Sequence, residues 1–354
     1  MLLEEHRPLA PFTTFGIGGP ARWFVAAESE EDVAEAAAWA RGHAAPLFVL
    51  GGGSNLLVSD EGFNGLVLHV CLRGVTKSTQ GGATVFSAAA GEDWDAFVEQ
   101  TARANCAGIE CLAGIPGTVG GTPVQNVGAY GQEVASVLSR VRAFDLTQHQ
   151  FVEFTAAECA FSYRRSRFSA DERGRYVVTR VDYRLTPGGA PTLRYADLQR
   201  AFPAGKATTL PEVTEAVRRI RHLKGMLLVA GDADCRSAGS FFKNPVVTLE
   251  EILAIQGEAG VEPPHFPAGP GPERDGMVKL PAAWLIEHAG FAKGFARGAA
   301  GISSRHTLAL INRGGATAEE ILALAHEIRE AVHARFHILL EREPVVIGFC
   351  NEQI

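Results

Sequence analysis

Hydrophobic residues along this chain follow two periods, one typical of helices and one typical of strands. Residues 92–104 and 317–335 have the helical period. In the first of these segments, the side chains predicted to face a core are Trp94, Phe97, Val98 and Thr101. Four short apolar runs are instead typical of buried strands: residues 46–50, 65–70, 83–91 and 176–185.

Polar residues at the ends of these segments predict where helices begin and stop. Ser29 and Asp32 have the spacing of a capping box, which opens a helix in the first 50 residues. Segments 209–212 and 248–251 have the same Thr-x-x-Glu pattern and predict two further helices. Gly260 is placed to end the second, because glycine readily adopts the left-handed conformation after a helix.

The rest of the chain adds shorter elements. They are a hairpin over 139–155, an ordered Pro- and Gly-rich loop over 260–278, a short helix over 281–290 and a final strand in PVVIGF (344–349). Helices and strands are mixed without the βαβ series of a doubly wound sheet, so the predicted fold class is α+β with several mixed sheets.

Composition narrows the class of protein. The 354 residues are 46% hydrophobic and 21% charged, with a net charge of −7, which disfavours general nucleic-acid binding. Apolar runs stay below the ~18 residues of a membrane span, and the acidic N-terminal residues do not suit a signal peptide. The six cysteines are scattered without a CxxC pair, which favours reduced thiols over disulfides or zinc.

Two glycine-rich stretches are the first candidates for chemistry. GGGSN (51–55) follows a predicted strand, and AGIPGTVGGTPVQNVGAYG (113–131) has six glycines. Such loops are either tight turns or sites where successive backbone N–H groups bind phosphates, and two of them favour phosphate or dinucleotide binding. The first lacks the Gly-Lys-Ser/Thr ending of a P-loop. The nominal G-x-G-x-x-A at 16–21 follows a poor strand and contains Pro20, so we reject a Rossmann site there.

Motifs spread over nearly the whole chain resemble one family. They are FTTFGIGG (12–19), VLGGGSNLLVSD (49–60), AGIPGTVGGTPVQNVGAYG (113–131), FSYRRSRF (161–168), SAGSFFKNPVV (237–247), VKLPAAWLIEHAGF (278–291) and LEREPVVIG (340–348). In this order and combination they resemble the UDP-N-acetylenolpyruvoylglucosamine reductase (MurB) family. The resemblance implies an α+β fold with a two-part FAD-binding domain of the vanillyl-alcohol-oxidase type and a C-terminal α+β substrate-binding domain.

The resemblance also implies an activity and a domain order. The expected reaction is NADPH-dependent reduction of UDP-N-acetyl-3-O-(1-carboxyvinyl)-glucosamine to UDP-N-acetylmuramate through non-covalent FAD. The expected segments are two FAD-binding subdomains (1–73 and 74–224), a substrate-binding domain (225–335) and a tail returning to the active site (336–354). The residues expected to hold FAD are Gly51, Gly52, Gly53, Ser54, Asn55, Gly114, Ile115, Pro116, Gly117, Thr118, Gly120, Gly121, Asn126, Gly128, Ala129 and Tyr130.

Three residues match the catalytic positions of the family. Arg164 is expected to stabilise the enolate that forms when hydride adds to the vinyl ether, and Ser240 to protonate its carbon. Glu343, if protonated through a raised pKa, would also stabilise the enolate; Glu341 is the alternative because Pro344 departs from the family pattern. Without the resemblance, the arginines of 164–167 read as a solvated turn, and the serine and glutamates as turn and surface residues.

Further positions match polar residues around the substrate. They are Tyr163, Tyr195, Lys224, Lys243, Asn244 and Lys279. A lone lysine is otherwise expected to be solvent-exposed. Segments 225–237 and 261–276 depart from the family pattern, which leaves the nucleotide contacts open. The expected partners are the UDP-sugar and NADPH, with no metal, nucleic acid or membrane, in a cytoplasmic monomer.

Two other functions stay open at this stage. The first is another flavoprotein of the same fold, which would be favoured by a covalent flavin on His69 or Cys71. The second is a non-catalytic nucleotide-binding protein, which leaves the contexts of Arg164, Ser240 and Glu343 unexplained.

Overall fold

The computed structural model describes residues 1–170, 172–203, 208–268 and 276–349. Its contacts divide the chain into two units. Unit 1 consists of Met1–Arg7, Ala21–Gly53 and Phe63–Leu223, and unit 2 of Pro8–Pro20, Ser54–Gly62 and Lys224–Ile354. Each unit has its own hydrophobic core. The expected boundaries at 73, 224 and 335 stay predictions.

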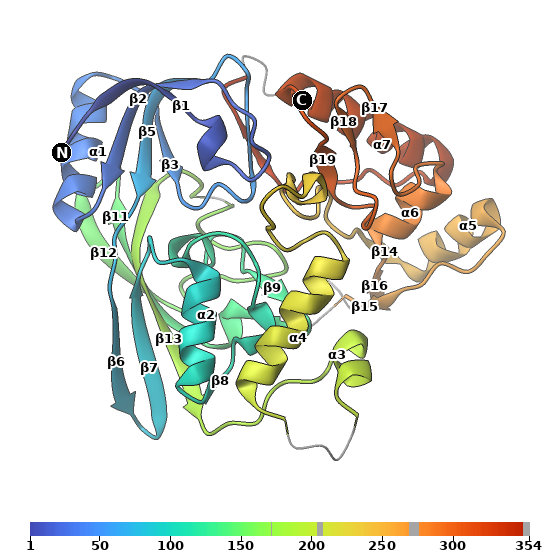
Figure 1. Cartoon of the computed structure of the whole chain (residues 1–354), viewed down its shortest axis with the longest axis horizontal. Coiled ribbons are helices and arrows are strands. Elements are labelled where there is room, and N and C mark those ends of the chain that lie inside the picture. The colour runs from blue at the N-terminus through green and yellow to red at the C-terminus, as the bar shows by residue number, and fades with distance from the viewer. Residues whose placement is uncertain (171, 204–207, 269–275, 350–354) are drawn as a thin grey trace. The chain divides into compact units, whose positions relative to one another are not determined.

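A four-stranded sheet opens unit 1 (Figure 1). Its strands are β1 (Glu4–Pro8), β2 (Pro20–Ala27), β5 (Phe63–Val70) and β3 (Leu47–Leu50), in that spatial order. β2 and β3 both run parallel to β5, and α1 (Glu30–Gly42) connects β2 to β3. The predicted capping box of α1 is confirmed, because Ser29 accepts from the Asp32 N–H and the Asp32 carboxylate accepts from the Ser29 N–H.

A larger antiparallel sheet forms the rest of the unit 1 framework. Its strands are β12 (Gln150–Thr155), β11 (Leu138–Asp145), β13 (Tyr176–Pro187), β7 (Ala83–Ala89) and β6 (Val75–Gln80), in that order, with β8 (Cys106–Ala107) pairing with β13. The predicted hairpin over 139–155 is confirmed as the β11–β12 pair. A small antiparallel pair, β9 (Gly128–Ala129) and β10 (Gln132–Glu133), lies within the second glycine-rich stretch.

Helix α2 (Trp94–Arg103) packs on this sheet through the apolar face predicted from its sequence. Trp94 and Phe97 contact Tyr183 of β13, with ring centroids 5.7 and 5.2 Å apart. All four residues predicted to face the core are buried in this helix. Two further helices follow the sheet in sequence, α3 (Ala196–Ala201) and α4 (Leu210–Leu223), and α4 packs against α2 (Figure 1).

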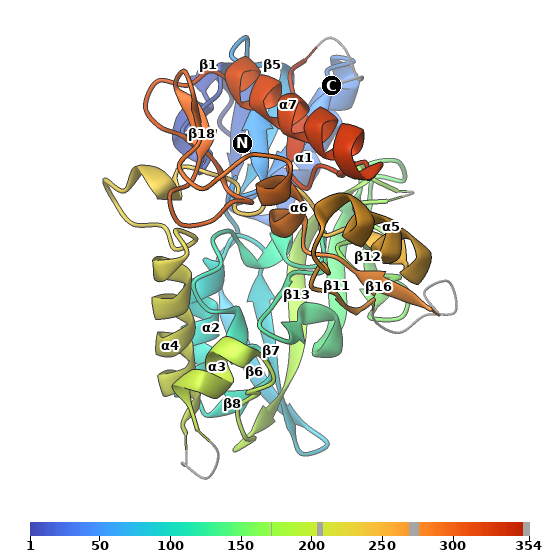
Figure 2. The same ribbon diagram turned by 90° about the vertical axis from the view of Figure 1, so that its right-hand side faces the viewer.

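The described residues of unit 2 form small sheets and three α-helices. The helices are α5 (Leu249–Ala259), α6 (Ala282–His288) and α7 (Ala318–Phe336). The strands are β14 (Val246–Thr248), β16 (Met277–Lys279) and β15 (Phe266–Pro267) in one sheet, β17 (Ala296–Arg297), β18 (Ala300–Ile302) and β19 (Leu310–Asn312) in a second, and β20 (Val345–Ile347) with β4 (Leu56–Val58) in a third. Figure 2 shows α7 beside α6, against which it packs.

Two early segments of the chain belong to unit 2. β4 pairs in parallel with β20, so residues 56–58 lie beside residues 345–347. The Asp60 carboxylate accepts from the N–H of Ala318 at the first turn of α7, where a negative charge is favourable. Phe15 packs edge-on against Phe241, with ring centroids 6.5 Å apart. These pairings join residues that are more than 200 positions apart.

Several sequence expectations can be checked against these elements. Gly260 has φ +72 and ends α5, as predicted. Rejection of the G-x-G-x-x-A match is confirmed, because strand β2, not a helix, starts at Pro20. The loop predicted over 260–278 contains β15 and the start of β16, and its residues 269–275 lie outside the described ranges. The five described cysteines are free thiols; Cys350 lies outside the described residues.

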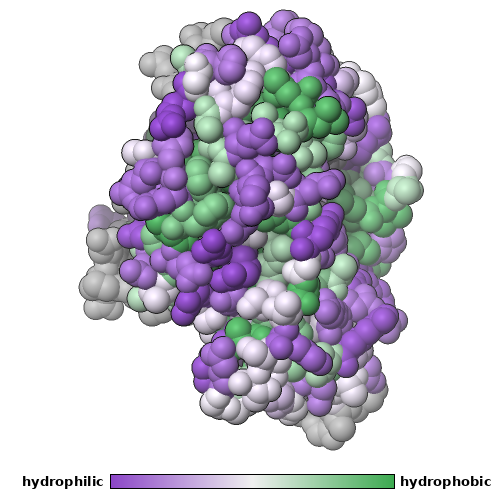
Figure 3. Space-filling view, turned by 90° about the vertical axis from the view of Figure 1, so that its left-hand side faces the viewer, coloured by the Kyte–Doolittle hydropathy of each residue, from purple (hydrophilic) through white to green (hydrophobic). Residues whose placement is uncertain are grey.

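Polar residues are prominent on the face of the molecule drawn in Figure 3. On the face drawn in Figure 3, hydrophilic residues cover most of the surface and hydrophobic residues lie between them in smaller areas. Ion pairs add to the polar surface of unit 1, among them Arg140 with Glu153 and Arg142 with Glu30. Among the described helices, none has both the length and the hydrophobicity needed to cross a bilayer.

Candidate active site

The two glycine-rich stretches meet inside unit 1. A Cβ atom placed on Gly52 would lie 2.6 Å from the Cα of Gly117, and one on Gly51 would lie 3.0 Å from the Thr118 hydroxyl. Gly117 has φ +129, a conformation that L side chains rarely adopt. Glycine at these positions therefore lets two backbone segments approach each other closely.

Backbone amides in these stretches fall into two groups. Among the described residues, the N–H groups of Gly52, Gly53, Gly117 and Thr118 donate to no protein acceptor. By contrast, the N–H of Gly120 donates to the Ala90 carbonyl at 2.8 Å. The first group is the set that can cradle a phosphate, because its donors are not used within the protein. The Gly120 amide instead fixes the loop to the sheet.

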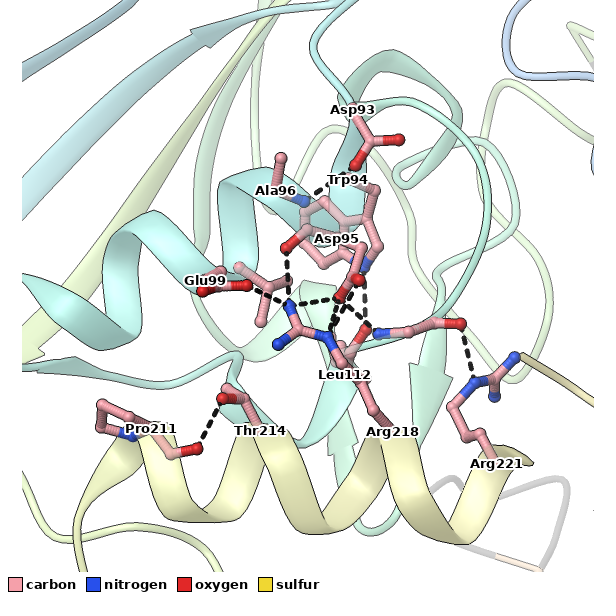
Figure 4. A network of polar contacts seen from close by, with 12 residues as sticks. Asp93, Trp94, Asp95, Ala96, Glu99, Leu112, Pro211, Thr214, Arg218 and Arg221 are labelled. Atoms are coloured by element: carbon pink, nitrogen blue, oxygen red, sulfur yellow. Dashed lines mark hydrogen bonds and ion pairs between the residues drawn. The ribbon is translucent and has the colours of Figure 1, made fainter. Parts of the chain in front are cut away.

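Helices α2 and α4 hold the beginning of the second stretch (Figure 4). The Trp94 indole N–H donates to the Leu112 carbonyl at 3.1 Å. The Gly114 N–H donates to Asp95 at 2.5 Å, and the Gly114 carbonyl accepts from Arg221 at 2.9 Å. Burial lowers the pKa of Arg221, which also has the Tyr130 phenol as a hydrogen-bond partner.

Asn126 fixes the same stretch farther along. It is buried with φ +46, and its amide donates to Glu133 and to the Ser162 carbonyl, both at 3.1 Å. Its side-chain oxygen accepts from the Ala135 N–H. All these bonds are internal, so Asn126 connects the glycine-rich stretch to the turn that carries Arg164.

Arg164 occupies a tight turn of strained conformation. Ser162 and Arg165 exchange two backbone hydrogen bonds, of 2.9 and 3.2 Å, around Tyr163 and Arg164. Arg164 has φ +54 at the turn position where glycine is preferred. Its guanidinium donates to the Gly128 carbonyl at 2.9 Å. A side chain held in such a conformation is typical of functional sites.

Arg167, another arginine of the motif, is held by contacts with other side chains. Arg167 pairs with Glu172 at 2.9 Å and lies over the Phe154 ring, 4.8 Å from its centroid. Of these two arginines, Arg164 is therefore the one in the strained turn beside the glycine-rich stretch.

Tyr130 and Tyr195 form an edge-to-face pair, with ring centroids 5.2 Å apart. Tyr130 is buried with φ +50, whereas Tyr195 is exposed at the N-cap of α3. Tyr195 thus places an aromatic side chain against the end of the second glycine-rich stretch.

Ser240 lies in unit 2 on a segment fixed at both ends. The Thr14 hydroxyl donates to the Ser237 carbonyl at 2.5 Å, and the Phe241 N–H donates to the Leu308 carbonyl at 2.8 Å. Gly239 has φ +72. In the described part of the chain, the Ser240 side chain makes no hydrogen bond, so its hydroxyl is available to a ligand or solvent.

Glu343 lies on the chain segment beside Ser240. An antiparallel bridge joins Phe242 to Arg342, and the Glu343 N–H donates to the Phe241 carbonyl at 2.9 Å. The Glu343 carbonyl accepts from the Asn55 amide at 3.2 Å, so Asn55 holds the tail in place. The first glycine-rich loop is divided between the units: Gly51 to Gly53 belong to unit 1, and Ser54 and Asn55 belong to unit 2.

The two candidate glutamates differ in exposure and partners. Glu341 is exposed and pairs with Lys243 at 3.1 Å, whereas Glu343 is half-buried. The two glutamates therefore lie in different environments, and Glu343 is the less exposed.

The residues expected around the substrate lie in several places. Lys224 directly follows α4, and Lys279 ends β16 opposite Val246. The Asn244 side-chain oxygen accepts from the Ala282 N–H at the start of α6, so this oxygen is used within unit 2. Tyr163 is the other central residue of the Arg164 turn.

Neither a covalent flavin site nor a metal site gains support. Cys71 and His69 contact each other, with 3.3 Å between Sγ and Nδ1. Burial raises the pKa of the Cys71 thiol and lowers that of His69, which makes the thiol a weaker nucleophile. No cluster of His, Cys, Asp or Glu suited to a metal ion occurs within the described ranges.

Comparison with known proteins decides the family. A reductase of Streptomyces coelicolor named UDP-N-acetylenolpyruvoylglucosamine reductase is 48% identical over 96% of this chain and 89% of its own length. The protein of that name from Thermobifida fusca is 44% identical over 96% of this chain and 97% of its own. The chain belongs to the UDP-N-acetylenolpyruvoylglucosamine reductase (MurB) family.

Family models and a solved structure agree with this assignment. The model described as FAD binding domain matches residues 21–148, and the C-terminal domain model of UDP-N-acetylenolpyruvoylglucosamine reductase matches residues 231–347. The crystal structure of MurB from Thermus caldophilus has a TM-score of 0.67 and 28% identity, covering 98% of this chain and all of that one. The predicted family, α+β fold, enzyme class and use of FAD and NADPH are thereby confirmed.

Sequence reasoning missed residues that hold the segments carrying the candidate site residues. They are Thr14, Trp94, Asp95, Arg218 and Arg221. Arg218 and Arg221 share a helical face by their spacing of three, which was visible in the sequence. The backbone atoms and carboxylates that they contact are more than 100 positions away, and no local pattern reveals such partners.

Proposed function

We propose that this chain catalyses the NADPH-dependent reduction of UDP-N-acetyl-3-O-(1-carboxyvinyl)-glucosamine to UDP-N-acetylmuramate. The observation that carries the proposal is family membership over 96% of the chain, at 48% identity to a reductase of that name. The geometry supports it, because the motifs of unit 1 gather around a pair of glycine-rich loops and those of unit 2 join Ser240 to the tail.

FAD would be held by the glycine-rich loops of unit 1. The close approach of Gly52 to Gly117 leaves no room for side chains, and the N–H groups of Gly53 and Thr118 are available for its diphosphate. The chemistry that FAD supplies when bound, without a covalent bond to the chain, is transfer of a hydride from NADPH to the substrate.

Arg164 and Glu343 would stabilise the charge that develops on the substrate. Addition of hydride to the terminal carbon of the vinyl ether spreads negative charge into the neighbouring carboxylate. The planar guanidinium of Arg164 suits a carboxylate with enolate character. The turn around Arg164 is held by backbone bonds before substrate binds, and such preorganised donors are effective in catalysis.

Ser240 would complete the reaction by giving a proton to the carbon of the enolate. Its hydroxyl has no partner within the described residues, and its segment is fixed through Ser237 and Phe241. A positioned acid of this kind is the remaining requirement of the reaction. Glu343, on the adjacent segment, would share in stabilising the enolate.

Six polar residues would bind the UDP-sugar. The proposed set is Tyr163, Tyr195, Lys224, Lys243, Asn244 and Lys279. The lysines provide charge complementarity to the diphosphate. We place the enzyme in the bacterial cytoplasm as a monomer in peptidoglycan precursor synthesis, because UDP-sugars and NADPH are found there; cell shape and division depend on that synthesis.

Two half-reactions, measured one after the other, test this proposal. The purified protein should be yellow, NADPH should bleach the flavin anaerobically, and the enolpyruvyl substrate should restore the colour. Product analysis should show UDP-N-acetylmuramate. A flavin that is reduced by NADPH but recolours only with oxygen would instead favour another flavoprotein of this fold, and a colourless protein would favour non-catalytic nucleotide binding.

A further inference from the structure

The beginning of the second glycine-rich stretch is held by charged groups on both sides of one residue. The Gly114 N–H donates to the Asp95 carboxylate of α2 at 2.5 Å, and the Gly114 carbonyl accepts from Arg221 of α4 at 2.9 Å. Gly114 itself has φ +70. Both polar groups of this residue are therefore used to set the direction in which the stretch begins after the short turn Glu110–Leu112.

Asp95 is in turn held by a second arginine of α4. Arg218 Nε lies 3.1 and 3.0 Å from the two Asp95 carboxylate oxygens, and its Nη2 lies 3.0 Å from one of them. The same Nη2 pairs with Glu99 at 2.8 Å, and Glu99 also pairs with Arg103. The two carboxylates and two guanidinium groups of this network balance each other, and Arg221, on the other side of Gly114, adds one positive charge.

The first turn of α2 makes two further contacts, one with the residue just before the glycine-rich stretch and one within it. The Trp94 indole donates to the Leu112 carbonyl, and the Trp94 backbone N–H donates to the Gly117 carbonyl, both at 3.1 Å. Asp95 provides the attachment between them, at Gly114. It is the charged member of the three, and a carboxylate makes a stronger bond to an N–H group than a neutral oxygen does.

A carboxylate at this position creates an electrostatic problem for a loop that binds a diphosphate. Asp95 accepts from the Gly114 N–H, and Gly114 is three residues before Gly117 in the sequence. An uncompensated negative charge there would repel the cofactor. Arg218, which is 24% exposed, and Asp95, at 31%, would add little to stability as a partly exposed ion pair.

We propose that Asp95 and Arg218 are positioning residues for FAD. Asp95 fixes the Gly114 peptide, and Arg218 cancels the charge of Asp95, so that the loop is held rigidly without repelling the FAD diphosphate. The proposal rests on the proposed function, because it assumes that the glycine-rich loops bind FAD. It assigns no contact with FAD to either side chain.

The test compares FAD affinity among variants of the holoenzyme. Purified protein is diluted at ~0.05 M and ~0.5 M salt, and release of FAD is followed by flavin fluorescence. The variants are Arg218→Met, Asp95→Asn, the double variant and a matched control, Arg219→Met. Arg219 lies on the same helix and pairs with Glu215 on an exposed face, so the control removes an arginine and an ion pair away from the loop.

Arg218→Met should weaken FAD binding about tenfold at low salt, the size of effect that one unit charge produces on another over about 12 Å at an effective dielectric constant of about 20. The loss should shrink at high salt, because screening weakens the repulsion. Asp95→Asn keeps an oxygen that accepts from Gly114 and should stay within about threefold of the unmodified protein. The double variant should return to that range, since neither charge remains.

Two results would overturn the proposal. Equal FAD affinity in Arg218→Met and Arg219→Met would rule out charge compensation by Arg218. A double variant that binds FAD as weakly as Arg218→Met would show that the loss of affinity comes from packing. Thermal melts check that each variant is folded. Failure of the proposed function is distinct from either result, because the unmodified protein would then bind no FAD or would not reduce the enolpyruvyl substrate.

Discussion

At the scale of single residues, the proposed site of unit 1 is marked by backbone conformation. Asn126, Tyr130 and Arg164 have φ values of +46, +50 and +54, in the left-handed region that side chains other than glycine rarely occupy. Each is held there by its surroundings, as the hydrogen bonds of Asn126 and of the Arg164 turn show. The sequence reveals no such strain, because these residue types are ordinary in turns and loops.

Arg164 allows strain and chemistry to be separated by two substitutions. Arg164→Gly and Arg164→Ala both remove the guanidinium, but glycine accepts the positive φ without cost. We expect the glycine variant to be more stable than the alanine variant by about 1 kcal/mol, measured by denaturant unfolding with FAD bound. Both variants should slow flavin reoxidation by the substrate while leaving reduction by NADPH nearly unchanged. Equal stability of the two variants would show that the turn is not strained.

The choice between Glu343 and Glu341 is open to a direct comparison. Glu343→Gln should slow flavin reoxidation by the substrate about 10²–10³-fold, the usual cost of losing one preorganised charge-stabilising group. Glu341→Gln should cost far less, because Glu341 is exposed and paired with Lys243. Stopped-flow absorbance of the flavin would measure both. A larger effect at Glu341 would show that the tail has been aligned with the family two residues out of register.

At the scale of elements, local sequence rules found most helices and strands. Capping boxes at Ser29, Thr248 and Thr317 are present in α1, α5 and α7, and the first two were predicted as such. The predicted Thr209–Glu212 pattern forms the same reciprocal bonds at the start of α4. These signals work because capping is decided by residues three positions apart. The contact between the two glycine-rich loops could not be predicted in this way, since Gly52 and Gly117 are far apart in sequence.

The close approach of those loops predicts a specific loss of FAD. Gly117→Val places a β-branched side chain at φ +129 and against Gly52, so the loops must separate. The purified variant should retain much less FAD than the unmodified protein, as measured by the ratio of flavin to protein absorbance. Gly42→Val is the matched control, because a Cβ there meets no atom within 4 Å. Equal flavin content in the two variants would contradict the account of the loops.

At the scale of the whole molecule, two early segments of the chain belong to unit 2, whose main part begins only at Lys224. Residues 8–20 and 54–62 belong to unit 2, and β4 pairs with β20 from the end of the chain. The segments predicted from the sequence are continuous, and their boundaries stay predictions. Long-range strand pairing depends on which surfaces meet after folding, and the hydrophobic pattern of a single segment does not specify its partner.

The chemistry of the site was predicted from the resemblance more than from residue patterns. Ser240 in an Ala-Gly-Ser-Phe-Phe context could be a simple turn residue by sequence alone. The structure adds that its segment is fixed and that the segment of Glu343 lies beside it. The supporting groups, such as Asp95 and Arg218, became visible only with the packing of α2 against α4.

The central claim, that Ser240 protonates the substrate carbon, is tested most directly by Ser240→Ala in stopped-flow half-reactions. The variant should keep FAD and be reduced by NADPH at close to the normal rate. Its reoxidation by the enolpyruvyl substrate should fall by at least the ~10²–10⁴-fold that a positioned general acid provides. Ser240→Cys should retain more activity than the alanine variant, because a thiol can still deliver a proton. Reoxidation of Ser240→Ala by the substrate at a near-normal rate would contradict the account and would assign the proton to water or to Glu343.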